Sequence, residues 1–102
     1  MVALVEDHKD ELADICQQLG VLTLSLFGSA ARDDFQPESS DLDFVVEFVP
    51  MAPDDHARSY FKLLKELEHL FQRRIDLVEA SAVHNPYIRR NIETSRVPIY
   101  AA

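Results

Sequence analysis

Two aspartates separated by one residue, Asp41 and Asp43, are the residues of this sequence most suited to chemistry. They stand where an apolar run, "FVVEFV", begins, and side chains two apart in a strand point to the same face. Carboxylates held close together disfavour each other's ionisation, and a divalent cation between them removes the repulsion. Hard oxygen ligands suit Mg²⁺ or Mn²⁺. The pair therefore favours a cation site, although an exposed turn before a strand can contain the same residues.

A third aspartate, Asp76, lies in the apolar segment "RIDLVE". An acid embedded among strand residues needs a partner. If this strand and the one that follows Asp41 are neighbours, three carboxylates converge, which is the composition that a two-metal site requires. An EF-hand is excluded, because the sixth and twelfth positions counted from Asp41 are Val46 and Ala52 rather than Gly and Glu.

A Gly28-Ser29 step follows the apolar segment "VLTLSLF". Glycine allows a ligand to approach the backbone closely, and a helical turn over residues 29–32 would offer N–H groups and a hydroxyl to phosphate oxygens. Alone, the step is typical of a plain turn. Its spacing from the aspartates makes it more informative. A chain with a strand, Gly-Ser, a loop and then Asp-x-Asp brings phosphate-binding amides and metal-binding carboxylates to one edge of a sheet.

The hydrophobic periodicity predicts the elements that must hold these residues. Helices are expected at residues 6–19, 54–72 and 86–94, and strands at residues 21–27, 42–49, 74–79 and 97–100. This order predicts an α/β (α+β) domain in which helices flank a small mixed β-sheet. A single domain over residues 1–102 is expected from the length.

The long helix at residues 54–72 is expected to cover the sheet. Asp54 or Asp55 is the predicted N-cap. The predicted buried stripe, widened by Tyr60, Leu63 and Leu70, comprises Ala57, Phe61, Leu64, Leu67 and Phe71. The alternative is an amphipathic helix that binds a partner. Tyr87 and Tyr100 are expected to pack against the rest of the chain.

Composition and charge narrow the function classes. The 47% of hydrophobic and 27% of charged residues are typical of a globular protein and argue against disorder. A net charge of −8 argues against binding a nucleic-acid backbone or an anionic membrane, and suits a cation site or a basic protein partner. The four histidines do not show zinc-ligand spacing.

The single cysteine, Cys16, excludes an internal disulfide and is expected to be a small core residue rather than a reactive thiol. No apolar run approaches the roughly 20 residues of a membrane span, and residues 1–11 do not resemble a signal peptide. The expected location is the cytoplasm.

The stretch "LFGSAARDDFQPESSDLDFVVEF" resembles the nucleotidyltransferase superfamily of the polymerase β type, and is most similar to the minimal nucleotidyltransferases, or MNT proteins. Their pattern is a strand, G-S, two residues, R-G, a loop, S-D-hydrophobic-D, a strand, and a later D in an "I-D-L-V" strand. The matching residues are Gly28, Ser29, Arg32, Ser40, Asp41, Asp43 and Asp76. Asp33 departs from the family's usual Gly, and Ala30 stands where a polar or basic residue is common.

The resemblance implies Mg²⁺-dependent transfer of AMP from ATP to a hydroxyl. It assigns both of two metal ions (Mg²⁺, with Mn²⁺ possible) to Asp41 and Asp43, and the ion that activates the acceptor to Asp76. The nucleotide-binding residues that it implies are Gly28, Ser29, Arg32 and Ser40. Arg32 could stabilise developing charge, or pair with a nearby acid such as Asp33, Asp34 or Glu38.

The resemblance also implies a partner, because MNT proteins are commonly paired with a HEPN ribonuclease toxin. The expected function is that of an antitoxin that modifies a toxin tyrosine with AMP. The alternative is a binding module without catalysis that masks its partner. Asp33 mildly favours this alternative, and the three aspartates argue against it. The sequence does not identify the NTP, the acceptor residue or the oligomeric state.

Overall fold

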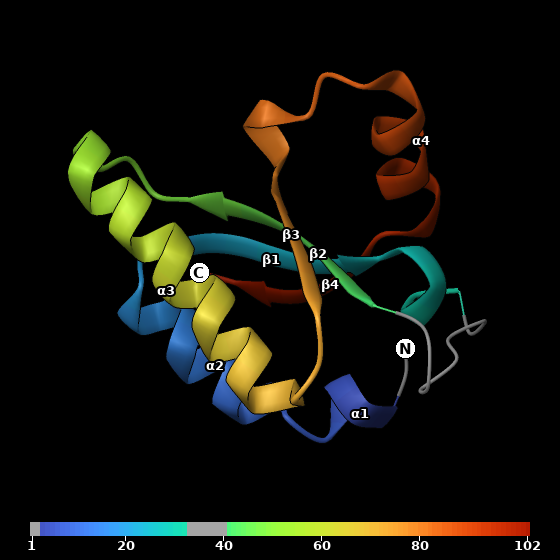
Figure 1. Ribbon diagram of the computed structural model, residues 1–102, viewed down its shortest axis with the longest axis horizontal. Helices are drawn as coiled ribbons and strands as arrows, with labels where there is room; N and C mark the ends of the chain where they lie inside the picture. Colours follow the sequence, from blue (N-terminus) through green and yellow to red (C-terminus); the bar gives the residue numbers. More distant parts are fainter. Residues whose placement is uncertain (1–2, 33–40) are drawn as a thin grey trace.

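The computed structural model describes residues 3–32 and 41–102 (Figure 1). The α-helices are α1 (Ala3–Glu6), α2 (Lys9–Gln18), α3 (Pro53–Phe71) and α4 (Pro86–Ser95). The strands are β1 (Val21–Phe27), β2 (Leu42–Phe48), β3 (Ile75–Glu79) and β4 (Val97–Ala101), and two short 3₁₀ turns are η1 (Gly28–Ala30) and η2 (Ala80–Ala82). Within the described ranges, no helix is long and apolar enough to cross a membrane.

The four strands form one mixed sheet in the order β3-β2-β1-β4, which confirms the predicted fold class. β1 pairs antiparallel with both β2 and β4, whereas β2 and β3 are parallel. A parallel pair needs a long crossover, and α3 supplies it. The crossover makes β3 an edge strand next to β2.

The two faces of the sheet are covered differently (Figure 1). Alternation along β1 and β2 directs Leu26 and Phe44 into the main core, which α1, α2 and α3 complete. Val45 points to the opposite face and packs with Phe27 and with Ile92 of α4. The short helix α4 therefore lies over the same face as Asp43, the alternate neighbour of Val45 on β2.

The helix predicted at residues 6–19 corresponds to α2, which begins three residues later, and the short helix α1 before the break at Asp7 and His8 was not predicted. The His8 ring occupies this break: its Nδ1 donates to Glu11 Oε1 at 2.8 Å, and the ring packs edge-on against Phe71 of α3. These contacts are made from a non-helical residue, which periodicity alone does not reveal. Cys16 is fully buried in α2, as predicted, and burial raises the pKa of its thiol to about 12.

The start of α3 also differs from the prediction. Ala52 is the N-cap and Pro53 opens the helix, where a proline has no hydrogen bond to lose, so Asp54 and Asp55 lie in the first turn instead. The buried positions are Leu63, Leu67 and Phe71, all in the second half of the helix.

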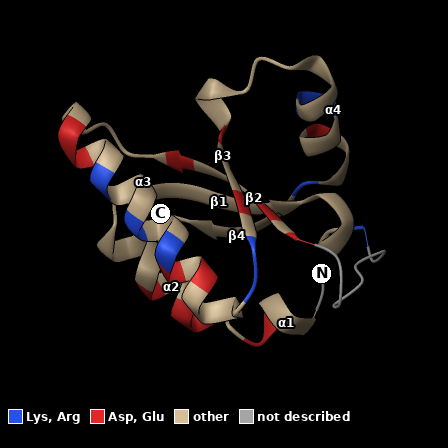
Figure 2. Ribbon diagram, in the orientation of Figure 1, with Lys and Arg blue, Asp and Glu red and all other residues tan. Residues whose placement is uncertain are grey.

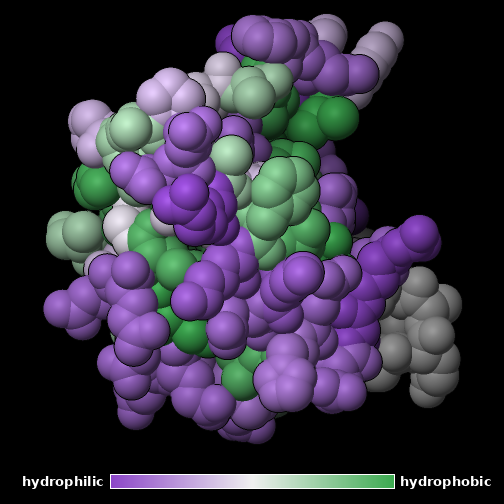
Figure 3. Space-filling view, turned by 60° about the vertical axis from the view of Figure 1, so that its left-hand side comes forward, coloured by the Kyte–Doolittle hydropathy of each residue, from purple (hydrophilic) through white to green (hydrophobic). Residues whose placement is uncertain are grey.

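Two residues predicted to lie in the α3 stripe, Ala57 and Phe61, are exposed; 61% of the Phe61 surface remains accessible. The first turns of α3 project beyond the sheet, which explains this difference (Figure 1). Tyr87 is 84% exposed and does not pack as predicted, whereas Tyr100 lies against the core. On the side of α3, hydrophobic surface appears as separate patches between hydrophilic side chains (Figure 3).

Candidate active site

Asp43 of β2 and Asp76 of β3 are direct partners in the register of the parallel pair. Asp41 lies immediately before β2, and Phe27, the residue before Gly28, is the partner of Asp43 on β1. This register confirms the expectation that the two acidic strands are neighbours, and Figure 2 shows acidic positions in red on both β2 and β3. The sheet therefore brings together residues that are far apart in the chain.

Asp43 lies in an unfavourable electrostatic environment. Its side chain is half-buried, and this burial raises its pKa from the ordinary 3.8 to about 6. The negative charges of Asp76 and Asp41 raise the pKa further, and the positive charge of Arg32 opposes them. A cation bound here would relieve this repulsion.

Asp76 was expected to be embedded in its strand, but it is exposed, as is Asp41. The neighbours of Asp76 on β3, Ile75 and Leu77, are buried in the main core. Alternation then directs the Asp76 side chain to the opposite face, where solvent reaches it. The Asp76 carboxylate is therefore accessible to a ligand.

The donor chemistry of Asp41, Asp43 and Asp76 fits Mg²⁺, because carboxylate oxygens are the ligands that this ion prefers. The part of the chain that is described contains no group of three or more His, Cys, Asp or Glu side chains already at metal-binding spacing. Magnesium is commonly held by one or two carboxylates together with substrate phosphates. The carboxylates present fit an ion that arrives with a nucleotide.

Gly28 allows the phosphate-side turn to approach the carboxylates. Its φ is +74°, a conformation that only glycine adopts readily. A Cβ built at this position would collide with Oδ2 of Asp43. The turn η1 begins at Gly28, and its hydrogen bonds continue to the N–H of Arg32. The helical turn predicted at residues 29–32 is therefore confirmed, with a start one residue earlier than predicted.

The helix α4 holds this turn in place through residues that the sequence analysis missed. The buried Gly28 N–H donates to Ser95 Oγ at 3.0 Å, and Ser95 Oγ donates to the Asn91 carbonyl at 2.6 Å. Arg32 Nη1 donates to Asn91 Oδ1 at 2.8 Å. Polar residues four apart on one helix face were a signal for this contact, since they mark a face that meets another polar group.

These contacts refine the expected roles around the turn. The Gly28 N–H is already engaged, so the N–H groups of Ser29 and Ala30 are the ones at the start of the turn that are suited to an anion. Ser40 and Asp33 lie outside the described residues.

Comparison with known proteins shows the family to which the chain belongs. The model of the nucleotidyltransferase domain family matches residues 9–99. A candidate protein adenylyltransferase of Methanocaldococcus jannaschii is 34% identical over 90 residues, which cover 88% of this chain and 85% of the relative.

Two solved structures share the fold. One, described as a minimal nucleotidyltransferase, superposes with a TM-score of 0.66 at 29% identity, covering 91% of this chain and 90% of that chain. The other is an MNT antitoxin in complex with a tri-AMPylated HEPN toxin from Shewanella oneidensis, with a TM-score of 0.66, 13% identity, and coverage of 96% and 73%. The chain belongs to the nucleotidyltransferase domain family and is a minimal nucleotidyltransferase of the polymerase β type.

Proposed function

We propose that this protein transfers AMP from ATP to a hydroxyl of a partner protein in a magnesium-dependent reaction. The observation that carries the proposal is the register of Asp43 with Asp76, beside a glycine at which any side chain would collide with the Asp43 carboxylate. An acidic cluster next to a turn whose first N–H groups are suited to an anion would fit a metal-bound triphosphate. A masking module without catalysis would have no use for the unfavourable charge at Asp43.

In the proposed reaction, the acceptor oxygen bonds to the α-phosphorus of ATP, and the bond from this phosphorus to the bridging oxygen of pyrophosphate breaks. Asp41 and Asp43 would hold both magnesium ions, and Asp76 would help to hold the ion on the acceptor side, where its exposed carboxylate would also take the hydroxyl proton. Two magnesium ions, when bound, supply charge stabilisation to the attacking and leaving oxygens.

The turn after β1 would hold the pyrophosphate portion. Ser29 offers its hydroxyl and N–H group, and Gly28 provides the close approach of the backbone. Arg32, which Asn91 orients, is placed to offset charge at Asp43 and, we propose, on the phosphates. Ser40, which precedes Asp41, is assigned to the nucleotide by the family pattern.

The proposed partner is a HEPN-type toxin, which would make this protein an antitoxin. Support comes from the fold shared with the MNT antitoxin of Shewanella oneidensis and from the adenylyltransferase name of the archaeal relative. The net charge of −8 suits a basic partner. Both proteins would meet in the cytoplasm.

The test is transfer of label from α-labelled ATP. The protein is incubated with Mg²⁺, each labelled NTP in turn and an extract of its native cells, beside an Asp41→Asn/Asp43→Asn variant. Asp10→Asn/Asp14→Asn is the matched control, because it removes the same charge from exposed positions on α2. A labelled protein band with the wild type and the control, but not with the Asp41/Asp43 variant, is expected. A folded wild type that labels nothing with any NTP would favour the masking module.

A further inference from the structure

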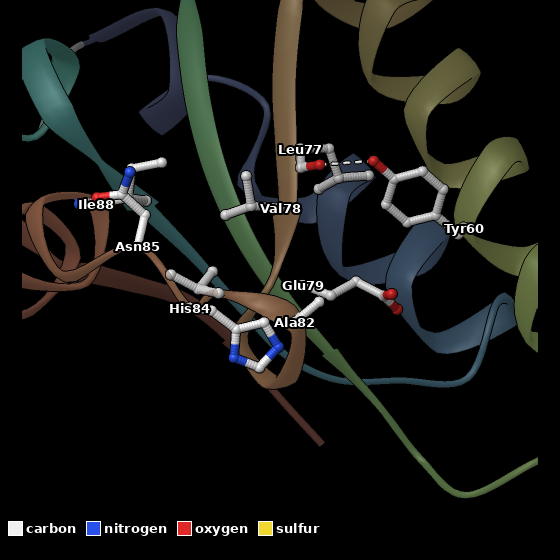
Figure 4. Close-up of a pocket in the computed structure, with 9 residues that line it drawn as sticks. Tyr60, Leu77, Val78, Glu79, Ala82, His84, Asn85 and Ile88 are labelled. Carbon is white, nitrogen blue, oxygen red and sulfur yellow. Dashed lines mark hydrogen bonds between the residues drawn. The ribbon is translucent and has the colours of Figure 1, made fainter.

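A pocket of about 500 Å³ opens along the edge strand β3 (Figure 4). One side is formed by Tyr60 of α3, and the other by the segment that leads into α4. The residues that line it are Tyr60, Leu77, Val78, Glu79, Ala82, Val83, His84, Asn85 and Ile88. None of the nucleotide-binding or metal-binding roles proposed above uses these residues.

We propose that this pocket, called here the β3 pocket, holds the acceptor side of the reaction: an aromatic hydroxyl residue of the partner protein, carried on a basic segment. The inference rests on the proposed function and deepens it, because it assigns the substrate's docking site. Three observations carry it: the place of the pocket on β3, the order of the strands, and the chemistry of the lining.

The β3 pocket begins next to the proposed acceptor-side acid. Val78, which lines it, lies two residues beyond Asp76 and points to the same face of β3. Side chains two apart in a strand are separated by about 7 Å. That distance is close to the span of a tyrosine ring, so a ring lying on Val78 can present its hydroxyl at Asp76.

The strand order places the pocket opposite the leaving group. Gly28 and Ser29 follow β1, Asp43 lies on β2, and Asp76 lies on β3, in the spatial order β1-β2-β3. In an in-line displacement the attacking and leaving oxygens lie on opposite sides of the phosphorus. With pyrophosphate on the β1 side, the acceptor must approach from the β3 side, where the pocket opens.

The lining of the β3 pocket suits an aromatic side chain on a basic segment. Leu77, Val78 and Ile88 supply apolar surface, and Ile88 is 41% exposed despite its size. Glu79 lines the pocket and is paired with His56, and the exposed carboxylate of Asp76 lies on the same strand, so this edge carries two acidic side chains. A basic segment is therefore complementary to this edge in charge.

The walls of the β3 pocket are held by hydrogen bonds. Tyr60 donates from its hydroxyl to the Leu77 carbonyl at 2.6 Å (Figure 4). Asn85 caps α4, because its Oδ1 accepts from the N–H of Tyr87 at 2.9 Å and of Ile88 at 3.3 Å. Glu79 is paired with His56 of α3. A pocket with walls held in this way loses little entropy when it binds an extended segment.

The competing occupant is the nucleoside of ATP. A smaller pocket of about 210 Å³ begins at Val45, two residues beyond Asp43 on β2, and extends to Ile92 of α4. We assign the nucleoside to this smaller pocket, because Val45 is on the same strand as Asp43, whereas the β3 pocket begins on the neighbouring strand at Val78. The β3 pocket is therefore left for the acceptor.

The experiment measures two dissociation constants on the full chain by amide NMR. One ligand is Mg²⁺ with α,β-methylene-ATP, in which the scissile bridge is blocked. The other is the peptide acetyl-Arg-Tyr-Arg-amide, added to the nucleotide-bound protein. Peptide-induced shifts are expected at residues 77–79 and 82–88, and nucleotide-induced shifts at residues 28–32 and 41–44.

Ala82→Phe fills the β3 pocket from an exposed position, and Ser81→Phe adds the same bulk to the neighbouring exposed residue, which does not line the pocket. Ala82→Phe should weaken peptide binding at least fivefold and leave nucleotide binding within twofold, while Ser81→Phe changes neither. The inference is overturned if the peptide does not bind, if it shifts other residues, if both variants behave alike, or if Ala82→Phe weakens the nucleotide instead. Failure of the proposed function is a different result, since the wild type would then neither bind magnesium nucleotide nor label a partner.

Discussion

The N–H of Gly28 donates a hydrogen bond to Ser95 Oγ at 3.0 Å, across 67 residues of sequence. The Ser95 hydroxyl in turn donates a hydrogen bond to the Asn91 carbonyl, so the last turn of α4 fixes the turn that faces Asp43. The proposed phosphate site therefore depends on a helix at the other end of the chain.

Replacing Ser95 with Ala removes the acceptor of a buried N–H group. The expected loss in the free energy of unfolding is about 1–3 kcal/mol, the usual cost of an unsatisfied buried donor. The dissociation constant of magnesium ATP should rise as well, because the turn is no longer held. Urea denaturation and a nucleotide titration measure the two effects. The control is Thr94→Ala, which alters an exposed hydroxyl that bonds only within α4; equal losses in both variants would contradict the assigned contact.

Gly28→Ala should disrupt the site more than an equivalent change elsewhere. Gly28 and Gly20 have nearly the same φ, +74° and +72°, so Ala at either position has a similar backbone cost, on the order of 1 kcal/mol. Only at Gly28 does the new Cβ collide with the Asp43 carboxylate; at Gly20 it meets the flexible end of Met51 at 3.0 Å.

Both glycine variants should therefore melt at a lower temperature, measured by thermal denaturation. Gly28→Ala alone should lose the rise in melting temperature that magnesium ATP produces in the wild type. An undiminished rise in Gly28→Ala would show that the turn does not contact the nucleotide.

Most of the fold could be predicted from the sequence, because strands and helices follow from local periodicity. The break at His8 and the exposure of Phe61 could not, since they depend on what lies beside each residue in space. The acids Asp43 and Asp76 were identifiable from residue type and strand context. For Ser95 the only signal was its spacing of four from Asn91, because a hydroxyl in a helix acquires its role from the backbone group it meets.

Asp43→Asn should stabilise the metal-free protein at neutral pH. The folded pKa of Asp43, about 6, exceeds the ordinary value of 3.8, so between these values the folded state binds more protons than the unfolded state. The contribution of this group to stability is therefore lost as pH rises from about 4 to 6. Asn carries no charge and avoids this loss.

The melting temperature of metal-free Asp43→Asn should exceed that of the wild type at pH 7.5, and the difference should vanish near pH 4. Asp10→Asn, at an exposed position of α2, is the control and should follow the wild type at both pH values. Adding magnesium ATP at pH 7.5 should reverse the order, since only the wild type keeps the proposed ligand. A variant that is less stable than the wild type without metal would contradict the charge repulsion at this site.

Asp76→Asn should separate nucleotide binding from transfer. Asp76 lies on the edge strand, on the far side of Asp43 from the Gly28 turn, and its side chain is exposed. Its proposed role is to act on the acceptor hydroxyl, and losing a positioned proton acceptor typically lowers a rate by 10²–10⁴-fold. We expect label transfer from α-labelled ATP to fall at least 100-fold, while the rise in melting temperature with magnesium ATP is retained.

Asp41→Asn is the comparison, because this residue is assigned to the metal-bound triphosphate and should lose both the thermal shift and the transfer. If Asp76→Asn loses the thermal shift as completely as Asp41→Asn, then Asp76 binds nucleotide and the acceptor does not approach over β3. If Asp76→Asn retains both the thermal shift and the transfer, another group accepts the proton of the acceptor hydroxyl. Only a retained thermal shift together with a lost transfer in Asp76→Asn supports a reaction in which the turn after β1 holds the leaving group and the acceptor approaches over β3.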